Sequence, residues 1–352
     1  MKGERALIAM SGGVDSSVAA FLMKESGFDC AGATMKLFPE ELCGGSPQDG
    51  AEDARRVAER LELPFFIFDF SDNFSRDVIE RFVADYKKGL TPNPCICCNR
   101  SLKFGKFLSR AKELDMERIV TGHYAVVCYD AASKRWGLKK GKDESKDQSY
   151  VLYSLTQQQL ACTLLPLGVM TKGEVREIAA ANGFINAGKR ESQDICFIPD
   201  GDYAAFIERR SGEAARPGRF VDAEGRTLGE HRGLVRYTIG QRRGLGLSLR
   251  ESLYVRAKRA ADNTVVLGKD NELFSKSLTA SDINLIACDK ISSPLRVSAK
   301  IRYRHREQPA TVEQLSENRI RVEFDEPQRA VTPGQAVVLY DGESVIGGGT
   351  IE

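Results

Sequence analysis

Short apolar runs alternate with helical patterns over the first third of the chain. The runs have the length of strands and lie at Ala6 to Met10, Ala31 to Met35, Pro64 to Phe68 and Arg118 to Thr121. The helical patterns between them lie near Val18 to Glu25, Ala51 to Leu61, Phe74 to Tyr86 and Phe104 to Leu114. This alternation predicts an α/β domain: a parallel sheet with helices on both faces and ligands at the carboxyl ends of its strands.

The pattern changes in the second half of the chain. A last helix is predicted over Lys172 to Asn182, and a stretch rich in glycine and arginine follows from Gly201 to Leu247. Short alternating strands then predict a small β-barrel; they are Ser252 to Arg256, Thr264 to Leu267, Arg296 to Tyr303 and Ala336 to Tyr340. We therefore expect an α/β domain over residues 1–203, a small central domain over 204–270 and a C-terminal β-barrel over 271–352.

Composition fits a globular protein that acts in a reducing compartment. With 352 residues, of which 42% are hydrophobic and 28% charged, the chain is long enough for two or three domains. No apolar run resembles a membrane span or a signal peptide, so we expect a cytoplasmic protein with no membrane partner. Nine cysteines without a secretion signal favour thiol chemistry over a disulfide framework. The net charge of +2 permits RNA binding but does not require it.

Residues 10–17, Met-Ser-Gly-Gly-Val-Asp-Ser-Ser, join the first predicted strand to the first predicted helix. Two glycines let a phosphate approach the backbone, serines add donors, and the helix directs its positive end at the anion. Neither the dinucleotide fingerprint nor the Walker motif occurs in the chain. The segment therefore predicts a pyrophosphate loop, in which Asp15 needs a bridging Mg²⁺. The alternative is a glycine turn capped by Asp15 or Ser16.

Two segments carry candidate reactive thiols. Residues 91–100 contain two prolines and predict a shaped loop, not a helix, bearing Cys95, Cys97 and Cys98. A helix predicted to begin just after Cys98, with Arg100 and Lys103 nearby, is expected to lower the pKa of this thiol and make it a nucleophile. Cys196 lies between isoleucine and phenylalanine, a setting more typical of a buried core cysteine when it is considered alone.

Taken together, these segments resemble one family, the tRNA-specific 2-thiouridylases of the PP-loop ATP pyrophosphatase superfamily. The resemblance spans nearly the whole chain, in order and in spacing. It is carried by residues 11–16 (SGGVDS), 35–36 (MK), 93–94 (NP), 98–99 (CN), 121–125 (TGHYA), 146–150 (KDQSY), 192–197 (SQDICF) and 237–244 (YTIGQRRG). It implies ATP- and Mg²⁺-dependent adenylation of the C2 oxygen of wobble uridine 34 in Lys, Glu and Gln tRNAs, followed by replacement of that oxygen with sulfur.

The resemblance also assigns roles to individual residues. ATP binding is implied for Ala9, Met10, Ser11, Gly12, Gly13, Val14, Asp15, Ser16, Met35 and Gly122. Contact with the target base is implied for Asn93, Pro94 and Cys95, and contact with tRNA for His123, Lys146, Asp147, Gln148, Arg302, Tyr303 and Gln335. Without the resemblance, these residues read as ordinary core residues, turns, solvated loops or an edge strand.

Cys98 and Cys196 carry the implied sulfur chemistry. The family likeness implies a persulfide on Cys196, loaded by a sulfur-relay donor, and attack by Cys98 that leaves a disulfide for a cellular reductant to reopen. One departure is Cys95, where many family members have aspartate; Cys97 replaces an apolar residue. Cys95, Cys98 and Cys196 offer three thiolates to a [4Fe–4S] cluster with one open iron, or to zinc, which we treat as a minority expectation.

Two rival functions stay open at this stage. A PP-loop amidating enzyme acting on a small nucleotide explains the loop but not the paired cysteines or the barrel. A non-catalytic tRNA-binding protein explains the basic tail but needs neither Asp15 nor Cys196.

Overall fold

A parallel sheet at the N-terminal end of the chain confirms the predicted α/β class. The computed structural model describes residues 3–38, 48–188, 195–248 and 251–352. The strands of this sheet run in the order β3-β2-β1-β4-β7. They are β1 (Arg5–Ala9), β2 (Asp29–Lys36), β3 (Phe65–Asp69), β4 (Arg118–Val120) and β7 (Thr163–Leu164). All of their pairings are parallel, as strands separated by helices require.

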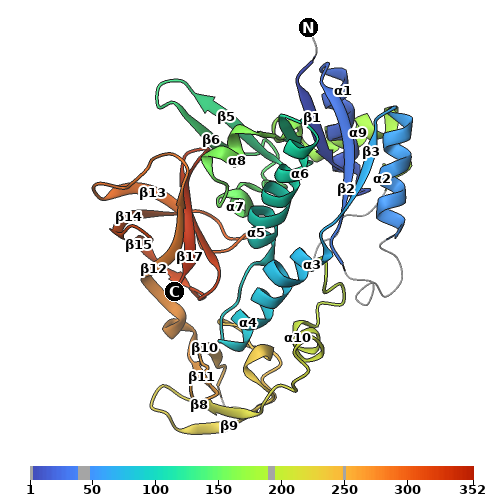
Figure 1. Cartoon of the computed structure of the whole chain (residues 1–352). Coiled ribbons are helices and arrows are strands. Elements are labelled where there is room, and N and C mark those ends of the chain that lie inside the picture. Colours follow the sequence, from blue (N-terminus) through green and yellow to red (C-terminus); the bar gives the residue numbers. More distant parts are fainter. Residues whose placement is uncertain (1–2, 39–47, 189–194, 249–250) are drawn as a thin grey trace.

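Helices bury both faces of this sheet (Figure 1). One face is covered by α1 (Val14–Glu25), α2 (Gln48–Arg60) and α9 (Lys172–Ala181). The other is covered by α3 (Ser71–Phe74), the π-helical η2 (Ser75–Glu80), α4 (Arg81–Lys87), α5 (Pro94–Cys98), the π-helical η3 (Asn99–Lys106) and α6 (Phe107–Glu113).

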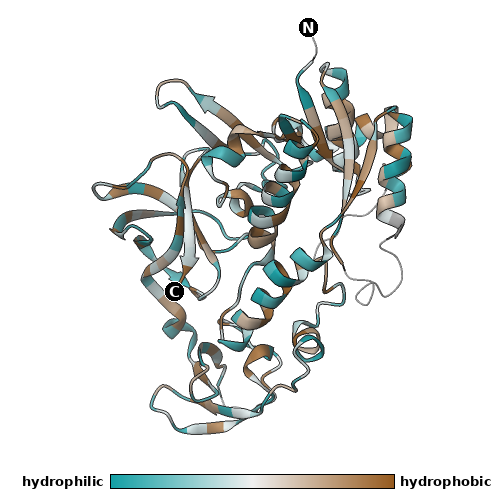
Figure 2. Cartoon of the chain, in the orientation of Figure 1, coloured by the Kyte–Doolittle hydropathy of each residue, from teal (hydrophilic) through white to brown (hydrophobic). Residues whose placement is uncertain are grey.

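Strand β1 shows why both faces close. Its side chains alternate, with Ala6 and Ile8 in the apolar cluster of α1 and α2, and Leu7 and Ala9 in the cluster of α5 and α6. Figure 2 colours the strands of this sheet mainly hydrophobic, whereas α2 carries many hydrophilic residues. The uninterrupted apolar run at the start of the chain therefore becomes a central strand buried on both sides.

The expectation of a loop over residues 91–100 is wrong from Pro94 onward. Asn93 is the N-cap of α5, and its side-chain oxygen accepts the backbone N–H of Cys95 at 3.1 Å. Pro94 occupies the first helical position, where its missing N–H costs nothing and its fixed φ suits the helix. The second proline thus starts a helical run that continues through η3 and α6 to Glu113, and Cys98 lies inside this run.

The rest of the chain forms two further sheets. A four-stranded sheet of order β10-β11-β8-β9 follows α10 (Tyr203–Ser211). Its strands are β8 (Gly218–Val221), β9 (Thr227–His231), β10 (Tyr254–Arg259) and β11 (Thr264–Gly268). The last sheet contains β12 (Phe274–Leu285), β13 (Leu295–Lys300), β14 (Gln308–Ser316), β15 (Arg319–Arg329), β16 (Ala336–Asp341) and β17 (Ser344–Ile351).

Strand β12 pairs with both β15 and β17 and thereby closes the last sheet into the predicted barrel. The expected strand from Arg296 to Tyr303 is too long, because β13 ends at Lys300. Arg302 and Tyr303 lie in the turn that follows it. They are therefore loop residues at the end of a barrel strand.

A hairpin from the first part of the chain extends the barrel sheet. Its strands β5 (Ala125–Asp130) and β6 (Arg135–Lys140) pair with each other, and Lys139 pairs with Ser344 at the start of β17. The short helices α7 (Ser149–Leu152) and α8 (Gln157–Ala161) follow this hairpin. The hydroxyl of buried Tyr150 on α7 donates to the carbonyl of Ala336 at 2.8 Å, which fixes the barrel against the parallel-sheet region. Sequence analysis did not anticipate this docking.

The remaining short elements are 3-10 turns, namely η4 (Pro166–Val169), η5 (Leu234–Arg236) and η6 (Asp270–Leu273). Among the residues that the structure describes, there is no helix with the length and apolar character needed to cross a membrane.

Candidate active site

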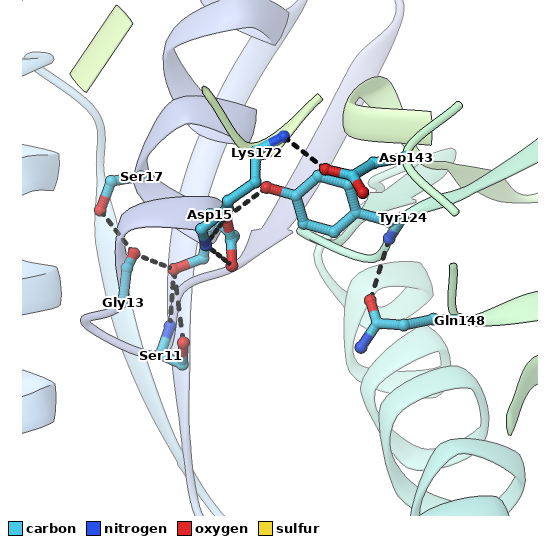
Figure 3. Close-up of polar contacts among 9 residues, drawn as sticks. Ser11, Gly13, Asp15, Ser17, Tyr124, Asp143, Gln148 and Lys172 are labelled. Atoms are coloured by element: carbon cyan, nitrogen blue, oxygen red, sulfur yellow. Dashed lines mark hydrogen bonds and ion pairs between the residues drawn. The ribbon is translucent and has the colours of Figure 1, made fainter. Parts of the chain in front are cut away.

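The predicted pyrophosphate loop, called the anion loop below, connects the end of β1 at Ala9 to the start of α1 at Val14 (Figure 3). Gly12 has a φ of +74°, and a Cβ there would lie 2.2 Å from the carbonyl oxygen of Gly50, so only glycine fits. The Ser16 hydroxyl accepts the backbone N–H of Ser11 at 3.2 Å and donates to the carbonyl of Gly13 at 3.0 Å. These contacts hold the loop in shape before any ligand binds.

Helix α1 begins without a side-chain cap. Gly13 is its N-cap residue and forms no side-chain hydrogen bond, while Asp15 lies one position inside the helix. The alternative of a turn capped by Asp15 or Ser16 is therefore wrong. Uncapped N–H groups at the N-terminus of a twelve-residue helix attract a phosphate.

The carboxylate of Asp15 is held by two residues that the sequence analysis did not select. Lys172 donates from Nζ to both carboxylate oxygens, at 2.7 and 2.8 Å, and the Tyr124 hydroxyl donates to Oδ1 at 2.7 Å. Lys172 is the first residue of α9, where Thr171 and Glu174 form a capping box. The Thr-Lys-Gly-Glu pattern could have predicted this lysine at a helix start, although not its partner Asp15 on the neighbouring helix α1.

This arrangement fits a magnesium–nucleotide complex. The side chain of Asp15 is 30% exposed, so its oxygens can still reach a ligand, and carboxylate oxygens are ligands that Mg²⁺ prefers. The side chain of Lys172 is only 9% exposed and supplies a positive charge beside the loop. Asp143 accepts the backbone N–H of Lys172 at 2.9 Å and so helps to fix the start of α9.

The predicted adenosine residues lie at the carboxyl edge of the parallel sheet, as expected for ligand-binding residues. Gly122 follows β4, and a Cβ there would lie 2.8 Å from the backbone of Asp15 and Ser16. Met35 lies near the end of β2, and the backbone N–H of Met10 donates to Ala33 of the same strand at 2.8 Å. Gly122 is thus needed for close approach to the loop.

The three candidate thiols of the sulfur chemistry come close enough to interact. Cys98 is buried, whereas Cys95, one helical turn earlier, and Cys196 are exposed residues. Burial is the main cause that raises the pKa of the Cys98 thiol to about 12; the nearby Cys196, Cys95 and Cys97 thiols contribute to the rise, and the charge of Lys103 opposes it. Although Cys196 is exposed as a residue, the protein around its thiol displaces enough water to raise its pKa to about 11.

The expected lowering of the Cys98 pKa is therefore wrong. The sequence analysis placed this residue just before a helix, but the helix begins at Pro94 and Cys98 closes α5 inside a continuous helical run. Its thiol is not at a helix N-terminus, and loss of water disfavours the thiolate more than Lys103 favours it.

The thiols do not form a ready metal site. Within residues 3–38, 48–188, 195–248 and 251–352, no group of three or more His, Cys, Asp or Glu side chains is arranged to hold a metal ion. Cys95, Cys98 and Cys196 as they stand therefore do not fit a three-thiolate cluster. The first half of the 192–197 motif, residues 192–194, lies outside the described residues.

Several residues predicted to contact tRNA have partners within the protein. Buried His123 has its Nδ1 2.7 Å from the Thr121 hydroxyl, and burial lowers the pKa of His123 well below its usual range. The carboxylate of Asp147 accepts the N–H of Gly141 at 3.0 Å, and Gln148 Oε1 accepts the N–H of Tyr124 at 2.9 Å. Lys146 is half-buried. Contact of tRNA with these four residues, at positions 123 and 146–148, stays a prediction.

The barrel residues predicted to contact tRNA also lie against the parallel-sheet region. Gln335 donates from Nε2 to the carbonyl of Thr91 at 2.6 Å, just before Asn93. Arg302 donates to the carbonyl of Arg329 at 2.9 Å. The ring of Tyr303, which is partly exposed, lies 6.0 Å from that of Tyr150. The turn at residues 302–303 therefore lies beside buried Tyr150, the last residue of the 146–150 segment.

Comparison with known proteins places this geometry in a family. Residues 4–200 match the family description "tRNA methyl transferase HUP domain", residues 204–269 the "tRNA methyl transferase PRC-barrel domain" and residues 275–351 the "Aminomethyltransferase beta-barrel domain". The tRNA-specific 2-thiouridylase MnmA of Moorella thermoacetica is 51% identical, covering 98% of this chain and 99% of the relative. The chain belongs to the tRNA-specific 2-thiouridylase family. The predicted family and the predicted enzyme class, sulfurtransferase, are thereby confirmed.

Other 2-thiouridylase relatives are equally complete. The MnmA proteins of Acetivibrio thermocellus and Carboxydothermus hydrogenoformans are 47% and 48% identical and cover 100% and 99% of this chain, and 100% and 98% of their own lengths. Among solved structures, the U34-tRNA thiolase NcsA from Methanococcus maripaludis with its [4Fe-4S] cluster is 16% identical, with a TM-score of 0.37, and covers 60% of this chain and 68% of that one. A 4-thiouridine synthetase–RNA complex with bound ATP is 20% identical, with a TM-score of 0.38 and coverages of 56% and 45%.

Replacing Lys172 by methionine should weaken the binding of ATP with Mg²⁺. Loss of a charge-assisted contact costs roughly 1.5–3 kcal/mol, which corresponds to about tenfold to hundredfold weaker binding. Isothermal titration with a non-hydrolysable ATP analogue measures this directly. Lys142→Met is a matched control, since Lys142 lies in a loop and pairs at the surface with Glu174 of α9, the helix that Lys172 begins. Equal affinity of Lys172→Met and wild type would remove Lys172 from the phosphate site.

Alkylation should report the raised thiol pKa values of this 2-thiouridylase. Because Cys98 is buried with a pKa of about 12, iodoacetamide should modify it slowly at pH 8, and the rate should rise as the pH increases towards 10. Cys196, with a pKa of about 11 and more exposure, should react faster. Mass spectrometry of the two peptides gives the rates, and urea-unfolded protein is the control. Rapid modification of Cys98 at neutral pH would contradict this assignment.

Proposed function

We propose that this chain uses ATP to replace the C2 oxygen of wobble uridine 34 with sulfur in Lys, Glu and Gln tRNAs, releasing AMP and pyrophosphate. The observation that carries the proposal is that Cys98 lies in the same apolar cluster as Ile195 and Phe197, the two neighbours of Cys196, although the two cysteines lie far apart in the sequence. Cys98 also belongs to the same buried cluster as Leu7 and Ala9 of β1, the strand that ends at the anion loop. An ATP loop alone suits many enzymes, whereas a thiol pair in the same domain suits sulfur transfer.

The first step activates a poor leaving group. The uridine O2 attacks the α-phosphorus of ATP, pyrophosphate leaves, and the C2 oxygen becomes part of an AMP ester. The loop over residues 10–16 and the N-terminus of α1 bind the phosphates, while Lys172 places a positive charge beside them. Asp15 would hold a Mg²⁺ ion beside the phosphates, and this ion would add to the neutralisation of their charge.

The second step delivers sulfur. The terminal sulfur of a Cys196 persulfide attacks C2 and AMP leaves, giving a C2–S–S–Cys196 link. The Cys98 thiolate then attacks the Cys196 sulfur, so that the S–S bond to the uridine breaks and a Cys98–Cys196 disulfide forms. A cellular dithiol returns two electrons and restores both thiols. Release of hydrosulfide from the persulfide before attack on C2 has the same electron balance.

The remaining assignments follow from the same proposal. Asn93, Pro94 and Cys95 at the start of α5 line the target base. The residues that contact the tRNA are His123, Lys146, Asp147, Gln148, Arg302, Tyr303 and Gln335. Residues 1–203 carry the chemistry, while the central domain (204–270) and the barrel (271–352) add tRNA contacts. The sulfur donor is a persulfide carrier of a relay, and the enzyme acts in the cytoplasm.

Thiolation of a Lys tRNA transcript with ATP, Mg²⁺ and a persulfide donor tests the function. Cys98→Ser and Cys196→Ser should each fall below about one hundredth of the wild-type rate, because each removes a covalent participant. Cys128→Ser, on the edge strand β5, should keep the wild-type rate. Product nucleosides are measured by liquid chromatography with mass spectrometry.

The same assay separates the rival functions. An amidating enzyme that acts on a small nucleotide would tolerate Cys98→Ser. A non-catalytic tRNA-binding protein would release no pyrophosphate on addition of uridine-containing tRNA. Wild-type protein that forms no 2-thiouridine under any of these conditions would overturn the substrate assignment.

The minority expectation of a [4Fe–4S] cluster on Cys95, Cys98 and Cys196 has its own test. We expect anaerobically purified protein to be iron-free and active, and Cys95→Ser to retain most of its thiolation rate, because the described side chains form no metal-binding group. Iron and sulfide analysis, with an absorption spectrum, measures the cluster. Stoichiometric iron together with equal loss of activity in Cys95→Ser and Cys98→Ser would favour the cluster over the disulfide route.

A further inference from the structure

The helical run that carries Cys98 changes its backbone form directly after this cysteine. Helix α5 ends at Cys98, the π-helical η3 continues the run from Asn99 to Lys106, and α6 resumes the α-helical form at Phe107. A π-helix joins residues five apart by hydrogen bonds, where an α-helix joins residues four apart. This form is rare, and it occurs frequently at functional sites. Its place next to a candidate reactive thiol therefore calls for a physical reason.

The π-helical form keeps one apolar face along the whole run. Cys98, Leu102, Phe107 and Ala111 all belong to the same buried cluster. Residues four apart share a face of an α-helix, but Leu102 and Phe107 are five apart, and a regular α-helix would turn them towards different sides. The π-helical spacing brings residues five apart above one another. Because of η3, Cys98 and Leu102 therefore face the same cluster as Phe107 and Ala111.

Gln159 on the neighbouring helix α8 holds η3 in this form. Its Nε2 donates to the carbonyl of Arg100 at 3.1 Å and to the carbonyl of Phe104 at 3.0 Å, and both of these residues lie in η3. Its Oε1 accepts the backbone N–H of Thr156 at 3.0 Å. Carbonyl groups only accept hydrogen bonds, so these partners fix which end of the amide faces η3. One side chain thus fastens two carbonyls of the π-helical segment to α8.

Two residues of η3 itself fit the same form. Asn99, which is 2% exposed, donates from Nδ2 to the carbonyl of Val151 on α7 at 3.1 Å and so anchors the start of η3. Gly105 lies five residues after Arg100, and a Cβ on Gly105 would lie 3.1 Å from the Arg100 carbonyl oxygen, closer than side chains ordinarily pack. A larger residue at position 105 would therefore press on the carbonyl that Gln159 binds.

We propose that Gln159 is a positioning residue for the sulfur-transfer step, because it holds η3 in its π-helical form and thereby keeps the Cys98 thiol beside the neighbours of Cys196. The inference rests on the proposed function, since it assumes that Cys98 attacks the sulfur of Cys196. If η3 relaxed to an α-helix, the residues before it would rotate by about 100° relative to α6, the angle that one residue spans in an α-helix. This rotation would turn Cys98 away from Ile195 and Phe197, with which it now shares a cluster.

The test compares how fast Cys98 and Cys196 join in wild type and in two Gln159 variants. Gln159→Met removes both donors, and the isosteric Gln159→Glu keeps the acceptor for Thr156 but cannot donate to η3. Oxidised glutathione takes up the two electrons when the Cys98–Cys196 disulfide forms, and peptide mass spectrometry measures the rate. We expect both variants to form this disulfide about tenfold to hundredfold more slowly, because small misplacements of reacting groups have effects of this size.

Thiolation of a Lys tRNA transcript provides the second readout. In both Gln159 variants, kcat should fall by a similar factor, while the KM values for ATP and for tRNA should stay near those of wild type. A merely structural role would lower the melting temperature and leave the disulfide rate of the folded protein unchanged. If Gln159→Met fails to fold, Gln159→Glu and Gly105→Ala take its place, and the same slow disulfide formation is expected, since Gly105→Ala disturbs η3 from within.

Gln158→Met and Gln158→Glu are the matched controls, because Gln158 is an exposed residue of the same helix. Both should behave as wild type, and Gln158→Glu also controls for the added negative charge. The proposal is overturned if the folded Gln159 variants form the Cys98–Cys196 disulfide at the wild-type rate. Wild-type protein that forms the disulfide rapidly, and loses this rate in the Gln159 variants, but makes no 2-thiouridine would overturn the proposed function and leave the positioning role of Gln159 intact.

Discussion

The ion pair between Asp15 and Lys172 is the contact on which the ATP site depends. A buried ammonium is costly unless a carboxylate faces it, so α9 can dock beside α1 only when Asp15 is in place. Tyr124, which lies between β4 and β5, donates to the same carboxylate. Three segments from distant parts of the chain are therefore fixed relative to one another by a single aspartate, and the shape of the anion loop is set before the nucleotide arrives.

The raised pKa values of the two thiols impose a second constraint, on how sulfur transfer can begin. With pKa values of about 12 and 11, Cys98 and Cys196 are protonated in the resting enzyme at neutral pH, which protects them from oxidation. The phosphates of a tRNA would raise these pKa values further, since a nearby negative charge disfavours the thiolate. Activation must therefore come from a change in the surroundings of the thiols or from transfer of the proton to a group within the assembled site.

Sequence reasoning succeeded where the signal was local. The apolar runs correctly predicted the parallel sheet. The glycine–aspartate segment from Met10 to Asp15 was recognisable because its chemistry lies in consecutive residues. It failed where local signals conflict: a proline usually ends a helix, yet Pro94 after the cap residue Asn93 begins one. It could not find the partnership of Lys172 with Asp15, or the pairing of β6 with β17, because contacts between distant segments leave no pattern in one sequence.

The barrel and the four-stranded sheet both contact residues 90–91, just before α5. Thr91 receives a hydrogen bond from Gln335 of the barrel and donates its N–H to Pro333. Lys258 of the four-stranded sheet reaches the adjacent carbonyl of Leu90 at 3.4 Å, and burial lowers the pKa of this lysine to about 8. The Lys258 ammonium has neutral oxygen partners at 3.4 and 3.5 Å, which compensate weakly for its loss of water. A negative group that approaches it would stabilise its charge. A tRNA bound by the barrel would therefore bring negative charge towards Lys258 and alter its contact with the segment that leads into α5 and Cys98. Binding of the substrate and placement of the Cys98 thiol would then depend on the same segment.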